Sequence, residues 1–302
     1  MPHTQTTRRS AVAGRFYPAD RKTLHAQVTA CLAVKPPNPI VCTGNDVLAV
    51  MVPHAGYVFS GAIAGMTLAG VPLPNSIFLL GPSHTGQGVP LSVWADGAWE
   101  TPLGNVCVDT ALAADLLARD AGFCADVAAH TREHSLEVVL PFLQVHTPQA
   151  RVVPVVVGGV SLERLRTAGE ALAETVRSAG VRGEAVGIVV SSDMSHFLPH
   201  DVTAQRDAQA LKALCSLDPE RFYATVRQGN ISMCGVLPMT LALYACRMLG
   251  ATDAEVVAYA TSGQTGKAVG ADMNRVVGYA GVIIRRTRAT DADALQGALS
   301  EV

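Results

Sequence analysis

The sequence predicts a single large α/β domain with a mostly parallel central sheet flanked by helices. The chain has 302 residues, of which 49% are hydrophobic and 16% charged, so it can bury a large core. Short β-branched and leucine-rich runs alternate with segments of helical spacing, which is typical of parallel sheets. No internal repeat or low-complexity linker divides the chain.

Each element is predicted from apolar runs that end at Gly, Pro or Ser, or from apolar residues that recur every three or four positions. The expected strands are 47–52, 77–80, 152–157, 186–190, 255–259 and 276–284. The expected helices are 24–32, 60–68, 109–119, 135–145, 162–178, 203–214, 219–227 and 236–249. The glycine-rich segment 261–274 is expected to be a loop. The domain is expected to span residues 11–285, between a flexible N-terminal segment, 1–10, and a flexible C-terminal tail, 286–302.

Three of the expected strands run into motifs that contain a histidine. Strand 47–52 leads to PHAGY with His54, strand 77–80 to GPSH with His84, and strand 186–190 to SSDMSH with Asp193 and His196. Ligands in open α/β sheets bind at the carboxyl ends of the strands, which meet at one edge. The three histidines therefore predict a metal site or an acid/base site at that edge.

Two further segments contain residue types suited to chemistry. His134 lies between Glu133 and Glu137, and nearby carboxylates are expected to hold one tautomer and raise the imidazole pKa. Stabilisation of a helix N-terminus by the two carboxylates is an equal alternative. Cys234 precedes a glycine and a long apolar helix, where a helix N-terminus stabilises a thiolate, although most buried cysteines are inert.

Composition narrows the classes of partner. Lys and Arg number 23 against 25 Asp and Glu, a net charge of −2, so no electrostatic footprint suggests nucleic acid or an anionic membrane. No apolar run reaches the roughly 20 residues that a spanning helix needs. The seven cysteines form no CxxC pair, which favours a reducing cytoplasm over a disulfide framework. The expected partner is a small neutral or anionic molecule.

An ordered set of motifs resembles the Memo family, including its bacterial and archaeal members called AmmeMemoRadiSam system protein B. The set is VAGRFYPAD, VPHAGYVFSG, LGPSH, EHSLEVVLPFL, SSDMSH, MCG and TSG…VVGYAGV, from about residue 12 to residue 284. The resemblance implies a fold similar to class III extradiol ring-cleaving dioxygenases and a metal pocket formed by His54, His84 and Cys234. It also implies that Asp193 and His196 line this pocket with His134 nearby, and that radical SAM and AMMECR1-type proteins are partners.

The implied ligand set has a definite chemistry. Two imidazoles and one anion leave half of an octahedron open, as in non-haem iron sites that hold a substrate and O₂ together. Fe(II) is the expected metal, and Cu or Zn are alternatives because a thiolate is a soft ligand.

The expected function is that of a cytoplasmic metal-dependent redox protein with dioxygenase-like activity on a small molecule. In this role Asp193 would orient a histidine ring, and His196 or His134 would accept a proton. One alternative is a non-catalytic metal- or peptide-binding module. The other is a zinc-dependent hydrolase in which Glu133 or His196 activates water.

Overall fold

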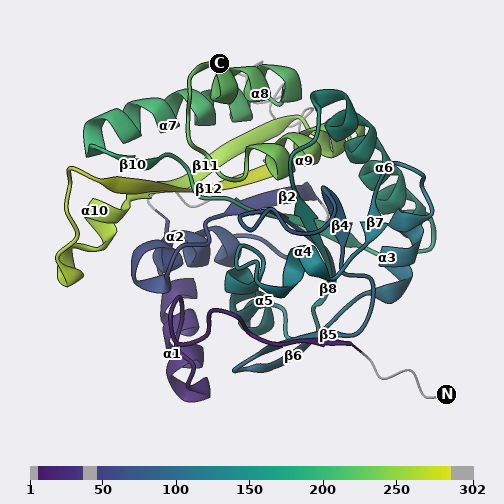
Figure 1. Ribbon diagram of the computed structural model, residues 1–302, viewed down its shortest axis with the longest axis horizontal. Helices are drawn as coiled ribbons and strands as arrows, with labels where there is room; N and C mark the ends of the chain where they lie inside the picture. Colours follow the sequence, from purple (N-terminus) through teal and green to yellow (C-terminus); the bar gives the residue numbers. More distant parts are fainter. Residues whose placement is uncertain (1–5, 37–45, 287–302) are drawn as a thin grey trace, which may run out of the picture.

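A nine-stranded mixed sheet forms the centre of the computed structural model, which describes residues 6–36 and 46–286 (Figure 1). Across the sheet the strand order is β10 (His196–Leu198), β12 (Val276–Arg285), β2 (Val47–Val52), β9 (Val186–Ser191), β3 (Ser76–Pro82), β8 (Arg151–Val157), β4 (Leu91–Val93) and β7 (Cys124–Ala125), and β11 (Asp253–Thr261) pairs with β12. Strands β2, β9, β3 and β8 are parallel neighbours. Strand β12 is antiparallel to β2, and β4 is antiparallel to β8. The predicted α/β fold is confirmed, with a parallel centre and antiparallel strands on both sides of it.

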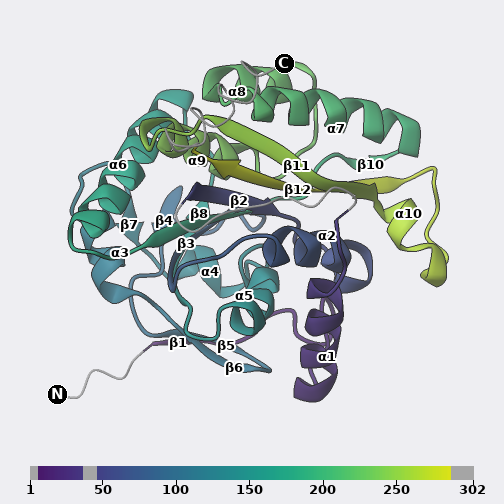
Figure 2. The same cartoon turned by 180° about the vertical axis from the view of Figure 1, so that it is seen from behind.

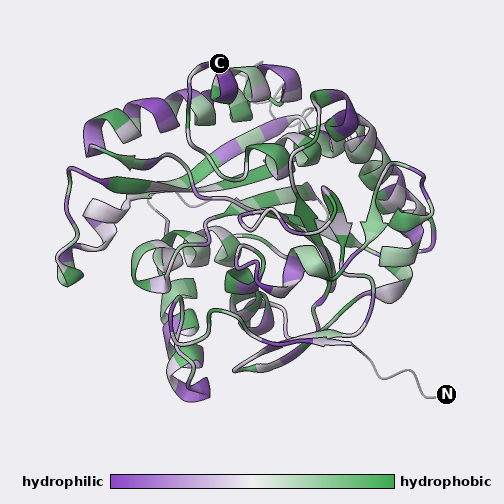
Figure 3. Ribbon diagram, viewed as in Figure 1, coloured by the Kyte–Doolittle hydropathy of each residue, from purple (hydrophilic) through white to green (hydrophobic). Residues whose placement is uncertain are grey.

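Helices cover both faces of this sheet (Figures 1 and 2). One face carries α1 (Arg21–Leu32), α2 (Tyr57–Ala69) and α5 (Leu140–His146), and the other carries α3 (Thr110–Leu117), α6 (Leu162–Val181), α7 (His200–Cys215), α8 (Pro219–Gln228) and α9 (Val236–Met248). Successive strand residues alternate between the two layers, so that Phe78 packs with one core cluster and Leu79 with the other. Figure 3 shows the hydrophobic strands between these layers. Among the described residues, no helix is both long and apolar enough to cross a membrane.

A three-stranded sheet that the sequence did not predict holds the N-terminal segment. Strand β1 (Thr7–Arg8) runs parallel to β5 (Ala98–Thr101), which pairs antiparallel with β6 (Gly104–Cys107). Residues 1–5 of the expected flexible segment, and residues 287–302 of the expected tail, lie outside the described residues. Arg8, by contrast, is only 2% exposed, so this part of the segment is packed into the domain.

Two expected elements differ from the structure. The helix expected at 135–145 begins only with α5 at Leu140, after a 3₁₀ turn (Glu137–Val139), because Pro141 is accommodated in the first turn of a helix and not in its interior. The loop expected at 261–274 contains α10 (Ser262–Thr265) and a 3₁₀ turn (Lys267–Val269). Thr261 and Gln264 form a capping box that starts α10, a signal present in the sequence as T-x-x-Q.

The register of the parallel strands brings the three histidine motifs to one edge. Val52 of β2 lies opposite Ser191 of β9, and Leu80 of β3 lies opposite Val190. The loops that follow these strands therefore emerge side by side. The loop of residues 132–136, between α4 (Ala128–Thr131) and the 3₁₀ turn, contacts the same edge, because the Ser135 hydroxyl donates to the Pro82 carbonyl at 3.0 Å.

Candidate metal centre

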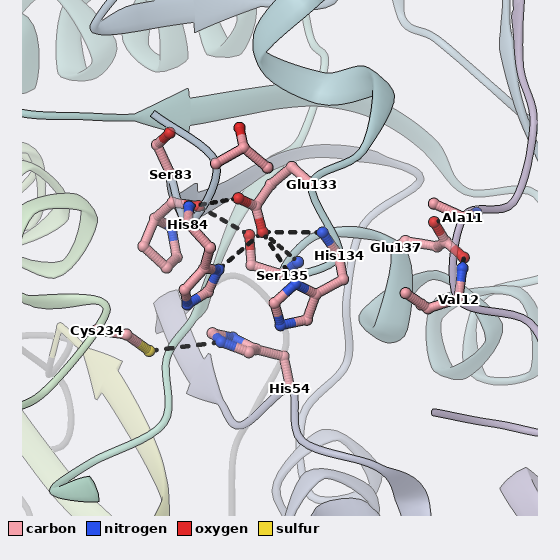
Figure 4. Close-up of polar contacts among 12 residues, drawn as sticks. Ala11, Val12, His54, Ser83, His84, Glu133, His134, Ser135, Glu137 and Cys234 are labelled. Carbon is pink, nitrogen blue, oxygen red and sulfur yellow. Dashed lines mark hydrogen bonds and ion pairs between the residues drawn. The ribbon is translucent and has the colours of Figure 1, made fainter. Parts of the chain in front are cut away.

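Three side chains from three loops converge at this edge of the sheet (Figure 4). His54 follows β2, His84 follows β3, and Cys234 lies just before α9. One donor atom from each lies within 4.8 Å of the other two. Cys234 Sγ is 3.4 Å from His54 Nε2, and the centroids of the two imidazole rings are 5.2 Å apart. These three residues, here called the donor cluster, are those that the sequence resemblance places in a metal pocket.

Hydrogen bonds fix the tautomer of the His54 ring. The Ser191 hydroxyl donates its hydrogen to the Ser135 carbonyl at 2.6 Å. It must therefore accept from His54 Nδ1, which lies 2.6 Å away. The proton of neutral His54 is then on Nδ1, and the Nε2 lone pair faces Cys234. Burial, followed by the neighbouring His84 and His134, holds the pKa of His54 well below its usual value, so this ring is neutral.

A buried carboxylate fixes the tautomer of the His84 ring. Glu133 Oε1 accepts from His84 Nδ1 at 2.8 Å, and Oε2 accepts from the His84 main-chain N–H at 2.5 Å. The main-chain N–H groups of His134 and Ser135 also donate to Oε1, both at 2.9 Å. Burial alone would raise the pKa of Glu133, but these hydrogen bonds lower it to about 2. Glu133 is thus a charged anchor that leaves His84 Nε2 free to bind a metal.

His134 lies against His84 and Glu133, and its pKa is shifted in the opposite direction from the one predicted. Its ring stacks on that of His84, with centroids 4.6 Å apart and planes at 26°, and Phe16 packs on it at 4.8 Å. Burial and then His84 lower its pKa, although Glu133 and Glu137 act in the opposite direction. The predicted rise in pKa from the flanking carboxylates is therefore wrong. Desolvation and a second imidazole outweigh them.

Asp193 and Cys234 also depart from the sequence predictions in detail. Asp193 Oδ1 accepts from the main-chain N–H of His54 at 2.8 Å, so it holds the loop and not a histidine ring. Burial raises the pKa of Asp193 to about 6. The Asp193 N–H donates to Cys234 Sγ at 3.2 Å, yet burial and then the Asp193 charge raise the thiol pKa instead of lowering it. A bound cation at this position would favour deprotonation of Cys234.

His196 lies beside the donor cluster without a hydrogen bond to it. Its Nδ1 lies 2.8 Å from the Ser232 carbonyl, which can only accept, so neutral His196 presents an Nε2 lone pair. The side chain is partly exposed, and in its protonated form it lowers the pKa values of both His54 and Asp193. The structure thus places His196 near the donor cluster, with Nδ1 directed at the Ser232 carbonyl and the side chain partly exposed.

Sequence reasoning missed the residues that orient the others. Ser191, Ser135 and Ser232 make the orienting hydrogen bonds, and no pattern in the sequence distinguishes them from other serines. The sequence identifies Glu133 as a carboxylate beside His134, but its hydrogen bond to His84 is a contact across 49 residues. The glycine that follows Cys234, Gly235, is a signal that is present in the sequence. A Cβ at this position would lie 2.3 Å from Ser192 Oγ, so the turn after Cys234 requires glycine.

The donor set fits a transition metal. Two imidazole nitrogens with fixed tautomers and one sulfur are ligands that iron, copper and zinc accept. A second group, His84, Glu133 and His134, also lies within 4.8 Å. It is the weaker candidate, because Glu133 already accepts four N–H hydrogen bonds.

Comparison with known proteins agrees with the motif pattern. A family model described as Memo-like protein matches residues 8–283. A MEMO1 family protein of Methanopyrus kandleri is 37% identical over 290 residues, which cover 92% of this chain and 99% of that protein. A MEMO1 family protein of Aquifex aeolicus is 38% identical over 277 residues, covering 91% and 98%. The chain therefore belongs to the Memo family.

Proposed function

We propose that the donor cluster binds a redox-active metal, with Fe(II) as the first choice, and that the protein oxidises a small molecule with O₂ in the cytoplasm. The observation that carries this proposal is the pair of imidazoles whose Nδ1 atoms are held by Ser191 and Glu133, so that both Nε2 atoms are available beside Cys234 Sγ. Iron held by three protein ligands supplies open positions for a substrate and O₂.

The surrounding residues support proton transfer at the same place. Asp193 is buried with a pKa raised to about 6, so its carboxyl group can exist in either state near neutral pH. His196 is partly exposed, and because its Nδ1 faces the Ser232 carbonyl, its Nε2 is the nitrogen available to a molecule at the site. We assign His196 the role of accepting a proton from a substrate hydroxyl or thiol, and His134, which is half-buried against His84 with a lowered pKa, the role of an alternative acceptor.

The alternative that the same residues form a zinc-dependent hydrolase is the weaker hypothesis. It needs a base to activate water, and Glu133 was one of the two candidates. Glu133 already accepts four hydrogen bonds from N–H groups of His84, His134 and Ser135, and its pKa of about 2 makes it a poor base near pH 7. Only His196 would then remain for this role.

The metal content of anaerobically purified protein tests the proposal. Near-stoichiometric iron is expected in the wild type and in Cys246→Ala, which removes a fully buried cysteine of α9 outside the donor cluster. Cys234→Ala and the double variant His54→Ala/His84→Ala should fold and lose the metal. Retention of tightly bound metal by the folded double variant would refute the site.

Two further outcomes separate the alternatives. Zinc in place of iron favours the hydrolase, because zinc has no redox chemistry. Bound metal without O₂ uptake across panels of catechols, aminophenols and thiols favours a non-catalytic binding module, as does the absence of metal from the wild type and Cys246→Ala alike.

A further inference from the structure

Arg8 is a buried arginine that contacts the loop carrying Glu133 and His134. It is 2% exposed, although it lies in the short N-terminal strand β1. Its Nε donates to the His130 carbonyl at 2.7 Å, and its Nη2 donates to the Glu133 carbonyl at 2.6 Å. The guanidinium carbon lies 4.1 Å from the centroid of the Trp99 ring. The planar guanidinium group thus holds both ends of the short segment 130–133.

Glu137 completes the arrangement from the other side. Its Oε2 accepts from Arg8 Nη1 at 2.7 Å and from the Ala11 N–H at 2.9 Å. Its Oε1 accepts from the Val12 N–H at 2.9 Å and from the Tyr17 hydroxyl at 2.7 Å. Figure 4 shows Glu137 beside Ala11 and Val12, to one side of the histidines. This fully buried carboxylate therefore anchors the N-terminal segment to the residues that follow His134.

The same N-terminal segment reaches the donor cluster by a second route. The Phe16 carbonyl accepts from the Tyr57 N–H at 2.8 Å, three residues after His54, and the Phe16 ring packs on His134. Residues 8–17 are thus tied to the loop that carries Glu133 and to the loop that carries His54. Both loops supply or orient members of the donor cluster.

We propose that Arg8 is a positioning residue of the donor cluster. By binding the carbonyl oxygens of His130 and Glu133, it holds the main chain from which the Glu133 side chain extends, and that carboxylate in turn holds His84 Nδ1. The inference rests on the proposed metal site and extends it to a residue of the N-terminal strand. Residues hydrogen-bonded directly to metal ligands commonly change metal affinity 10- to 100-fold, so Arg8, which acts through the main chain of Glu133, is expected to act at the lower end of that range.

A pair of variants separates positioning from simple loss of stability. Arg8→Lys keeps the charge opposite Glu137, but a single ammonium group cannot reproduce the fork that spans Glu137 and two carbonyls. Tyr17→Phe removes one hydrogen bond from the same buried carboxylate and leaves both carbonyl contacts in place. Co²⁺ is the probe, because its visible absorption reports its ligands. Arg8→Lys should weaken Co²⁺ binding about tenfold, whereas Tyr17→Phe should bind as the wild type does.

The tautomer of His84 gives a readout that a purely structural role would not change. In the metal-free wild type, imidazole ¹⁵N shifts should report a proton fixed on Nδ1 of His84, and in Arg8→Lys they should report a mixture of tautomers. Equal Co²⁺ affinity in all three proteins, or equal weakening in Arg8→Lys and Tyr17→Phe, would overturn the inference. Failure of the wild type to bind Co²⁺ or iron would instead overturn the proposed function.

Hydrogen exchange tests the coupling without any variant. Coupling free energies are reciprocal, so metal bound at the donor cluster must stabilise the contacts of Arg8 and Glu137 if these contacts stabilise the metal site. Saturation with Co²⁺ should slow exchange of the Ala11 and Val12 amides, which donate to Glu137. Slower exchange in the loop after β2, with no change at residues 11 and 12, would contradict the proposal even if Arg8→Lys failed to fold.

Discussion

The donor cluster and the surroundings of His130 both contain buried histidine, but the histidines differ in whether a ring nitrogen has a hydrogen-bond partner. His54 and His84 each have Nδ1 held by an acceptor. His130 is fully buried between Trp94 and Trp99, with ring centroids 5.9 and 5.7 Å away, and neither of its ring nitrogens makes a hydrogen bond with any described residue. Burial lowers the pKa of both His54 and His130. The comparison shows that burial makes a histidine neutral, whereas a partner on one nitrogen makes the other nitrogen a directed ligand.

Replacing the anchor of the cluster should produce the largest effect. Glu133→Gln removes the charge that four N–H groups share, and an amide nitrogen would face one or more of those donors. We expect metal affinity to fall about 100-fold and the free energy of unfolding to fall by about 3 kcal/mol. Metal titration and chemical denaturation measure the two quantities. Asp109→Asn, at a carboxylate that caps α3, should leave metal affinity unchanged, and a similar loss in both variants would contradict the assignment of Glu133.

The loss of stability in acid should report the lowered pKa of His130. Burial, and then the charge of Arg8, lower its pKa from 6.5 to about 4. Between these values the unfolded chain takes up a proton that the folded protein does not, so stability contributed by this group is present above pH 6.5 and is lost as the pH falls toward 4. Between pH 7 and pH 4, the free energy of unfolding of His130→Phe should therefore fall by up to about 3 kcal/mol less than that of the wild type. Chemical denaturation at several pH values measures this difference. If the free energies of unfolding of the two proteins changed with pH in parallel, the lowered pKa of His130 would be contradicted.

Removing the acceptor of His54 should give a smaller effect on the donor cluster. Ser191→Ala leaves His54 Nδ1 without its hydroxyl partner, so the ring loses its fixed tautomer and orientation. We expect metal affinity to fall about tenfold, in a metal titration, with the fold retained. Thr240→Ala removes another fully buried hydroxyl, in α9, and serves as the control. Unchanged affinity in Ser191→Ala would show that Cys234 and the loop alone direct the ring.

The smallest effect is expected at His130 near neutral pH. His130→Phe replaces an imidazole that makes no side-chain hydrogen bond within the described part of the chain by an apolar ring, in a site already lined by two tryptophans. We expect a change of less than about 1 kcal/mol in the free energy of unfolding at pH 7.5 and no change in metal affinity. The main-chain contact of His130 with Arg8 is kept in this variant. A large loss of metal would show that the two regions are chemically coupled and that the comparison fails.

The sequence predicted the six longest strands of the described residues and the convergence of the histidine motifs. Apolar runs such as 186–190 are local patterns, and parallel strands place their carboxyl ends at a common edge whatever the rest of the chain does. The position of Cys234 before a helix drew attention to it, the family resemblance implied that it lies in the metal pocket, and the structure brings it to His54 across 180 residues. Short strands such as β1 and β10 were missed, because two or three residues carry no periodicity that can be read.

The protonation states could not be predicted in the same way. The flanking carboxylates suggested a raised pKa for His134, but the dominant influences are burial and the stacked His84 ring. The expected contact of Asp193 with a histidine ring became a contact with the main chain of His54. Both differences arise because the strength of an electrostatic interaction depends on depth and on neighbours that are distant in sequence.

The sequence by itself determined that this chain is an α/β protein of the Memo family with His54, His84 and His196 at one sheet edge, because hydrophobic periodicity and motif order are properties of the linear chain. Only the tertiary structure decided which nitrogen each histidine offers, that Glu133 is an anchor, and that Arg8 holds the loop of Glu133. A buried polar group must find a partner wherever packing provides one, and here the partners lie between 36 and 137 residues away.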